Sequence, residues 1–210
     1  TVTNTGKVAG KEVVHLFTHI EHGFLFTLKE LITAPGKMQR NYIHGNRVKY
    51  QKPFSMFFIT GTISALLYFW VNTLLIRYFS SGDAGEAEFF RRYWVLLQIA
   101  LLPIYSLVIY LFFRKAKFNY GEIAVFQLYT FSFVFLLVSC LQLVKFFSHH
   151  LETRYLGVPL VLLYTILTNL NFFKGMKKGK VILLSLVSIV LNFLLAALVQ
   201  DTIIRMAFQN

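Results

Sequence analysis

The chain has 210 residues, of which 56% are hydrophobic, 17% aromatic and only 14% charged. Ordinary soluble domains carry about 25% charged residues, so this composition excludes them and indicates a protein whose solvent is a lipid bilayer. The formal net charge of +12 could also suggest a nucleic-acid partner. Because the Lys and Arg residues cluster in short segments beside apolar runs, we expect lipid phosphate, not nucleic acid, to neutralise them.

Residues 1–53 form a mixed, basic segment that precedes the first apolar run. From Glu12 to Ile32 apolar side chains recur at helical spacing, which predicts amphipathic helices on the cytoplasmic membrane surface, interrupted near Gly23. Pro35-Gly36 ends this pattern, and a short basic helix is predicted from Lys37 to Ile43. The segment is too short to bury a core of its own, so we expect the membrane to cover its apolar stripe.

Three histidines in this segment form the one arrangement that suggests a metal. His15, His19 and His22 follow an i, i+4, i+7 pattern and could share a helix face, with Glu12 as a fourth ligand. The alternative is a solvated or interfacial polar face. We favour it because Gly23 weakens the helix there and no second ligand cluster supports a metal site. We therefore predict neither a metal nor any other cofactor.

Five apolar runs have the length that a helix needs to cross a hydrocarbon core about 30 Å thick, which is about 20 residues. They predict an all-α integral membrane protein with five transmembrane helices. The fourth run is short and follows Gly157-Val158-Pro159, so a tilted, kinked or re-entrant helix is the alternative there. The predicted spans are residues 54–76, 94–113, 122–144, 156–173 and 181–200, followed by a tail at residues 201–210.

The basic residues alternate between the two ends of these spans. Of the 21 Lys and Arg residues, 8 precede the first span, 3 lie between the second and third spans, and 4 lie between the fourth and fifth. The remaining 6 lie on the other side, together with Asp83, Glu86, Glu88, Glu152 and Asp201. By the positive-inside rule this distribution predicts a cytoplasmic N-terminus and an external C-terminus.

Several basic residues stand within thirteen residues of the first span. We expect them to determine topology and contact anionic headgroups, and the alternative is specific binding of an anionic lipid or a protein partner. Arg47 is the strongest candidate for specific binding, because a guanidinium can hold a phosphate or carboxylate through two hydrogen bonds. The candidate lipid-binding or partner-binding residues are Arg40, Arg47, Lys49, Tyr50 and Lys52.

The third span begins with a helix-start pattern. Asn119 is the predicted N-cap, and Glu122, three residues later, completes a capping-box-like sequence. A carboxylate at this position also interacts favourably with the helix dipole. A proton or cation site at Glu122 is the alternative, because ionisable residues in membrane helices are often functional.

The apolar runs lack the groups that enzymes use. They contain no His or Asp, and Glu122 stands alone, so we predict that the protein is not an enzyme. Their amides and hydroxyls are the residue types that join helices to one another in membranes. We predict a scaffold, an assembly factor or an accessory subunit of a larger membrane complex, with other membrane proteins as partners. The alternative is a component of a small-solute or ion transporter or channel.

Two stretches resemble a known family. The first reads Gly23-Phe24-Leu25-Phe26-Thr27-Leu28-Lys29-Glu30-Leu31-Ile32, then Pro35-Gly36, Tyr42, Gly45-Asn46-Arg47, Tyr50 and Pro53, and the second reads Asn119-Tyr120-Gly121-Glu122 with Val125-Phe126. Both resemble an uncharacterised bacterial inner-membrane family, whose members often carry an N-terminal zinc ribbon. In this chain such a ribbon would precede Thr1. More distantly, the span arrangement resembles the five-span Golgi family that interacts with Rab GTPases. Neither resemblance implies an activity, but the first implies a bacterial inner-membrane location.

Overall fold

The computed structural model describes residues 23–79, 84–147 and 153–208, and every regular element within them is helical. Residues 23–33 form the first described helix. The elements that follow are α2 (Lys37–Ile43), α3 (Pro53–Phe79), α4 (Ala84–Arg92), α5 (Trp94–Phe112), a 3-10 turn η1 (Arg114–Ala116), α6 (Tyr120–Phe147), α7 (Thr153–Phe172) and α8 (Lys178–Phe208). The predicted all-α fold is confirmed.

Five of these helices, α3, α5, α6, α7 and α8, are long and apolar enough to cross a membrane. Each corresponds to one of the five predicted spans. The fourth, α7, is continuous although it contains Pro159, so its Gly-Val-Pro sequence does not divide the helix. The fifth, α8, continues beyond the predicted span at residue 200 and ends at Phe208, so the residues expected to form a tail prolong the helix.

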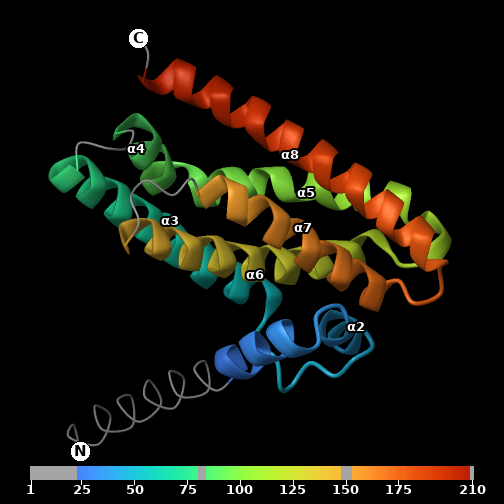
Figure 1. Cartoon of the computed structure of the whole chain (residues 1–210). Helices are drawn as coiled ribbons and strands as arrows, with labels where there is room; N and C mark the ends of the chain where they lie inside the picture. The colour runs from blue at the N-terminus through green and yellow to red at the C-terminus, as the bar shows by residue number, and fades with distance from the viewer. Residues whose placement is uncertain (1–22, 80–83, 148–152, 209–210) are drawn as a thin grey trace, which may run out of the picture.

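Helix α6 is the centre of the bundle (Figure 1). It contacts α3, α5 and α7, and it also contacts the short helix α2. Half of the residues in its most apolar stretch are buried, whereas in α8 the buried share is 17%. Helix α8 packs on α5 and α7 and leaves most of its surface uncovered. In a membrane, lipid chains are the natural cover for such a surface.

Aromatic rings fill much of the space between the helices. Phe57 of α3 meets Phe135 of α6 edge to face, with ring centroids 5.2 Å apart. Near the start of α6, Phe126 lies 4.2 Å from Phe172, measured between ring centroids, and Phe173 stacks on Phe113 at 4.0 Å. Rings bury large areas and gain additional energy from offset or edge-to-face geometry, so these contacts hold the helix pairs together.

Several of the buried polar side chains inside the bundle bind the backbone of their own helix. Their hydroxyls donate to the carbonyl four residues earlier, which satisfies them in an apolar environment. Such bonds occur at Thr60, Thr130, Ser132, Ser139 and Thr168. A different bond joins two helices: Asn169 Nδ2 donates to Ser185 Oγ at 2.8 Å, and both residues are buried. It links α7 to α8 by the kind of polar contact common between membrane helices.

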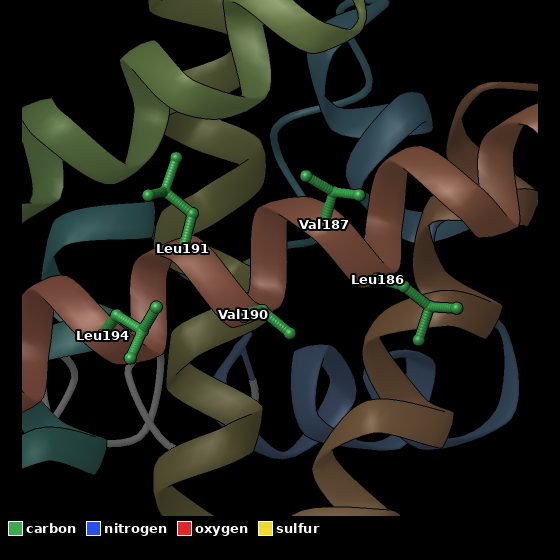
Figure 2. Close-up of a pocket in the computed structure, with 5 residues that line it drawn as sticks. All are labelled: Leu186, Val187, Val190, Leu191 and Leu194. Carbon is green, nitrogen blue, oxygen red and sulfur yellow. The ribbon is translucent and has the colours of Figure 1, made fainter.

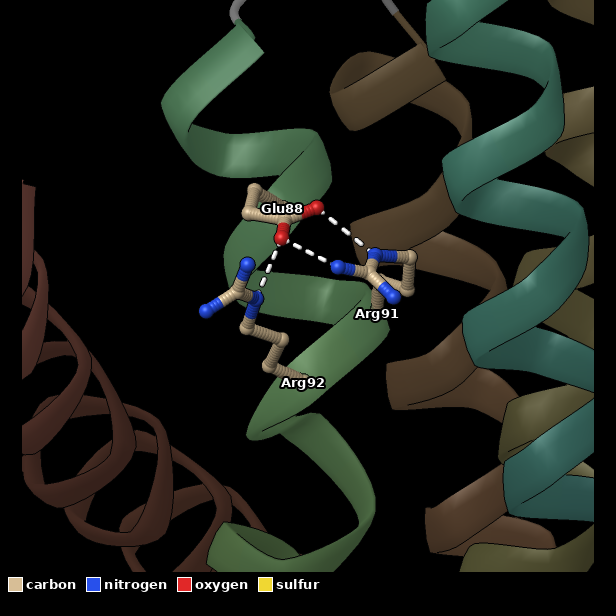
Figure 3. A network of polar contacts seen from close by, with 3 residues as sticks. All are labelled: Glu88, Arg91 and Arg92. Atoms are coloured by element: carbon tan, nitrogen blue, oxygen red, sulfur yellow. Dashed lines mark hydrogen bonds and ion pairs between the residues drawn. The ribbon is translucent and has the colours of Figure 1, made fainter.

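The two ends of the bundle differ in charge. One end, called the basic end below, is made of residues 23–52, 113–122 and 173–180 and carries thirteen Lys and Arg residues and two Glu residues. The other end carries α4, where Glu88 accepts hydrogen bonds from Arg91 and Arg92 (Figure 3). The Lys- and Arg-rich segments, which alternate with the other loops along the sequence, therefore gather at one end of the bundle.

Candidate functional site at the basic end of the bundle

The segment before α3 is docked on the bundle through Gly36. This residue has a φ of +80°, which an L side chain rarely adopts, and it joins residues 23–33 to α2. A methyl group on Gly36 would lie 2.2 Å from the carbonyl oxygen of Thr168 and 2.8 Å from the backbone nitrogen of Phe172. The Pro-Gly sequence therefore does more than end a helix, because only glycine lets the chain approach the last turn of α7 this closely.

Residues of α2 complete the contact with α7. The Arg40 guanidinium donates from Nη1 to the carbonyl oxygen of Phe172 at 3.1 Å. The last carbonyls of a helix have no partner within the helix, so this bond caps the end of α7. At the start of α2, Gln39 Oε1 accepts from the backbone N–H of Gly36 at 2.6 Å, which fixes the turn before the helix.

A chain of hydrogen bonds ties residues 23–33 to α6 through the segment that leads into α3. The buried Thr27 hydroxyl oxygen accepts from the backbone N–H of Gln51 at 2.8 Å. The carbonyl oxygen of Gln51 then accepts from the Tyr129 hydroxyl at 2.5 Å. Since Tyr129 lies in the third turn of α6, these bonds hold the entry to the first membrane helix against the central one.

An aromatic cluster surrounds this hydrogen-bonded chain. Tyr42 meets Tyr129 edge to face at a centroid distance of 5.3 Å and Tyr50 at 6.3 Å. Tyr50 also lies 5.5 Å from Phe26, measured between ring centroids. On the outer side, the exposed Arg47 guanidinium lies over the Tyr42 ring, 5.7 Å from its centroid. A cation at this distance from a ring face is attracted to it, so Tyr42 positions Arg47.

A crevice of about 230 Å³ opens beside Arg47. It lies between α2 with its following loop and the first turns of α6, and its walls are Tyr42, Ile43, Arg47, Gly121, Glu122 and Val125. Two residues that the sequence selected separately, Arg47 and Glu122, thus line one cavity. The crevice brings a cation, an anion and apolar wall together at one end of a membrane bundle.

The carboxylate of Glu122 also closes the start of α6. Its Oε2 accepts from the backbone N–H of Asn119 at 2.8 Å. Because α6 begins at Tyr120, Asn119 is the N-cap and Glu122 the third helical residue, as the capping pattern predicts. Glu122 therefore makes a capping contact at the start of α6, and its position in the crevice wall leaves its carboxylate accessible to a ligand.

The other predicted binding residues occupy different surroundings. Lys49 and Lys52 are exposed and lie outside the crevice wall, and Arg40 is engaged with α7. Tyr50 is buried in a cluster that includes Leu31, so its contacts are with packing partners. Binding by these residues stays a prediction. The metal candidates His15, His19 and His22, with Glu12, lie outside the described residues.

Sequence reasoning missed the residues that dock the segment. Gln39, Thr27 and Gln51 were not selected. Thr27 and Gln51 are hydrogen-bonded to each other across 24 positions, which no local pattern reveals, whereas Gln39 accepts a hydrogen bond from Gly36 in a local capping pattern that was overlooked. One signal was present: buried polar residues such as Thr27 and Gln39 interrupt a segment whose other inward positions are apolar. Interruptions of this kind indicate hydrogen bonds to a neighbouring element.

A second hollow lies on the uncovered side of α8. It has a volume of about 390 Å³ and is a shallow groove between apolar side chains that project from the helix (Figure 2). Its walls are Leu186, Val187, Val190, Leu191 and Leu194. No group in this wall can bind a polar ligand, so the groove suits a lipid chain or an apolar partner helix.

Comparison with known proteins gives one match. A family model described as "Protein of unknown function (DUF3667)" matches residues 21–65, which cover the docked segment and the first half of α3. No curated protein and no solved structure matches the chain. The predicted resemblance to an uncharacterised family is supported over these residues, and the chain is similar there to a family with no assigned activity.

Proposed function

We propose that the protein is a non-enzymatic scaffold, assembly factor or accessory subunit of a membrane complex, located in a bacterial inner membrane with a cytoplasmic N-terminus and an external C-terminus. The observation that carries this proposal is the contrast between a filled bundle interior and an uncovered α8. A protein that acts on solutes needs polar groups around a path, whereas one that acts by association needs free surface.

The bundle interior supports this choice. Several buried hydroxyls of the spans, such as those of Thr60, Thr130 and Ser132, are satisfied by their own helices, and the rings described above fill much of the space between α3, α5, α6 and α7. Ser106 Oγ of α5 is buried without a hydrogen-bond partner among the described residues. Of the two hollows described above, one lies on the outer side of α8 and the other at the basic end. Neither passes between the spans, so the geometry favours association over transport.

The uncovered side of α8 is the proposed surface for another membrane protein. Val190, Leu194 and Leu198 are each more than half exposed and lie at helical spacing along it. Membrane helices associate by close van der Waals packing, for which a shallow apolar groove provides shape. The basic end would meanwhile face anionic headgroups, and the exposed Leu25 and Ile32 of the first described helix would insert among them as part of an amphipathic surface segment.

Purification from native membrane tests the proposal. We expect the protein to retain a membrane partner in stoichiometric amount after gentle solubilisation, and Val190→Trp to release it by filling the groove. Leu160→Trp is the matched control, because Leu160 is exposed on α7 and away from the groove. A monodisperse monomer without partner from native membrane would contradict the proposal. Solute flux into vesicles that contain the protein alone would instead support the transport alternative.

A further inference from the structure

The crevice at the basic end contains opposite charges that do not neutralise each other. Arg47 and Glu122 both line it, but the two side chains form no ion pair in the described part of the chain. They are 75 positions apart in sequence and are brought together by α2 and α6. A cavity with a cation on one wall and an anion on another is suited to a ligand that carries both charges.

We infer that this crevice binds a zwitterionic headgroup with a phosphate and a primary ammonium group, of which phosphoethanolamine on a membrane lipid is the simplest. The Arg47 guanidinium would donate to the phosphate, because its planar fork matches two phosphate oxygens. The ammonium group would donate to Glu122. This inference concerns a lipid and does not depend on the proposed association with a protein partner.

Each wall of the crevice is prepared for this ligand. The contact with the Tyr42 ring restrains the Arg47 side chain, which lowers the conformational entropy that Arg47 loses on binding. Asn119 holds one oxygen of Glu122, and Oε1 has no hydrogen-bond partner among the described residues. Gly121 exposes open space, since a methyl group there would meet no atom within 4 Å. The backbone amides at the start of α6 also favour an anion nearby.

Size and position favour a lipid headgroup as the source of these charges. The volume of about 230 Å³ is below the roughly 300–1,000 Å³ of sites that enclose a whole small molecule. A headgroup needs only this room, because its acyl chains remain in the bilayer. Ile43 and Val125 give the crevice apolar walls at the end of the spans, where the chains of a lipid begin.

The ammonium is expected to be primary because Glu122 needs a donor. A primary ammonium offers three N–H groups, whereas the quaternary ammonium of a choline headgroup offers none. The face of Tyr42, which could otherwise attract a quaternary ammonium, is already occupied by Arg47. A glycerol headgroup supplies the phosphate but no cation. Comparing the retention of the three lipids therefore distinguishes the contribution of Arg47 from that of Glu122.

The experiment measures lipid retention on the purified full chain. The protein is equilibrated with an equimolar mixture of ethanolamine, choline and glycerol phospholipids with identical acyl chains, and the bound lipids are counted by native mass spectrometry. We expect the ethanolamine lipid to be retained about three- to tenfold better than the choline lipid, the range that one partly exposed charge-assisted hydrogen bond gives. Equal retention of these two lipids by the unmodified protein would overturn the inference.

Variants assign the two halves of the headgroup. Glu122→Gln keeps the bond from Asn119, because glutamine also serves in a capping box, but it removes the charge. We expect it to abolish the preference for ethanolamine over choline. Arg47→Gln should weaken retention of all three lipids, and Gly121→Leu should do the same by filling the crevice. Lys178→Gln is the control for an exposed cation of the basic end that lies outside the wall, and it should leave the preference among the three lipids unchanged.

Two further outcomes complete the test. If Lys178→Gln lowers retention as much as Arg47→Gln, general attraction to the basic end explains the binding and the crevice is excluded. Free phosphoethanolamine is added in a separate arm to distinguish a lipid from a soluble ligand. Retention of the lipid that is unaffected by free phosphoethanolamine at equal concentration supports a lipid ligand. Equal binding of both would assign the site to the soluble compound and overturn the lipid assignment.

Discussion

Gly36 connects two helices and touches a third, and both properties depend on the absence of a side chain. Its positive φ lets the chain turn from residues 23–33 into α2, and its bare Cα lets that turn lie against the backbone of α7. Gly45 also has a positive φ, of +105°, but a methyl group there would meet no atom within 4 Å. Comparing substitutions at Gly36 and Gly45 therefore distinguishes the free-energy cost of the backbone conformation from the cost of steric overlap with α7.

We predict that Gly36→Ala destabilises the protein more than Gly45→Ala does. Both changes place an L residue in the left-handed region, at a cost of about 1–2 kcal/mol, but only the first also forces the segment away from Thr168. Thermal unfolding in detergent should show a drop of about 2–4 °C for each kcal/mol lost. Tryptic cleavage after Lys37 should increase in Gly36→Ala only. Equal behaviour of the two variants would show that the contact with α7 has no energetic importance.

The bond between Asn169 and Ser185 gives a second prediction at this scale. Interhelical hydrogen bonds of membrane proteins contribute about 0.6 kcal/mol on average and up to about 1.7 kcal/mol. We expect Asn169→Ala and Ser185→Ala each to lower the unfolding free energy, and the double variant to lower it by less than the sum, because they remove the same bond. Additive losses in this double-mutant cycle would argue against the bond. Thr73→Ala, on an exposed face of α3, is the control.

At the scale of elements, the length of the apolar runs predicts which segments form membrane-length helices, but it does not predict where those helices begin and end. Predicted starts and ends for α3 and α5 differ from the observed ones by no more than three residues. The largest difference is at the end of α8, which continues past the apolar run to Phe208. There Arg205 pairs with Asp201 at 2.9 Å across one helical turn, so charged residues that look like a tail support further helix.

Helix α4 was not predicted, because nine residues with four charged side chains have no membrane-span pattern. Its apolar positions are nevertheless used: Phe89 is fully buried, and Phe90 stacks on Trp94 at a centroid distance of 4.5 Å. The charged side chains of Glu88 and Arg91 lie on the exposed side of α4. There the hydrogen bonds from Arg91 lower the pKa of Glu88 to about 2. The helix is thus amphipathic over too short a length for periodicity to reveal it.

This pKa gives a prediction for α4. Since the folded-state pKa of Glu88 is depressed from 4.5 to about 2, its contribution to stability is present above pH 4.5 and is lost as the pH falls towards 2. The difference in Tm between the unmodified protein and Glu88→Gln should therefore be constant above pH 4.5 and shrink below it. High salt should also reduce the difference, because the pair is partly exposed. A difference that persists unchanged at pH 2 would exclude the ion pair as its source.

The candidate site shows how far the sequence leads and where it stops. Arg47 was selected for its guanidinium near the membrane and Glu122 for its place at a helix start, and both selections rest on local chemistry. Their common crevice depends on the docking of α2 on α6, which in turn depends on Gly36 meeting α7 and on Thr27 meeting Gln51. Contacts between positions so far apart leave no periodic signal in a single sequence, so the residues were predictable and the cavity was not.

At the scale of the whole molecule, the separation of charge between the two ends determines the expected orientation. The docked segment, the loop before α6 and the loop before α8 all lie at the basic end. Three separate basic stretches of the sequence therefore predict the same orientation of the bundle in the membrane. If each of the five membrane-length helices among the described residues crosses the bilayer, residues 23–33 and the end of α8 are expected on opposite sides. The positive-inside rule predicts that the basic end faces the cytoplasm.

Cysteine labelling tests this orientation. Cys140, which is exposed on α6, is first replaced by serine, and single cysteines are then introduced at Lys177, Lys178 and Gly85. We expect Lys177→Cys and Lys178→Cys, at the basic end, to react with a membrane-impermeant reagent only from the cytoplasmic side. Gly85→Cys, in α4, should react only from the outside. Labelling of all three from one side would contradict five crossings, and a reversed pattern would place the phospholipid crevice in the opposite leaflet.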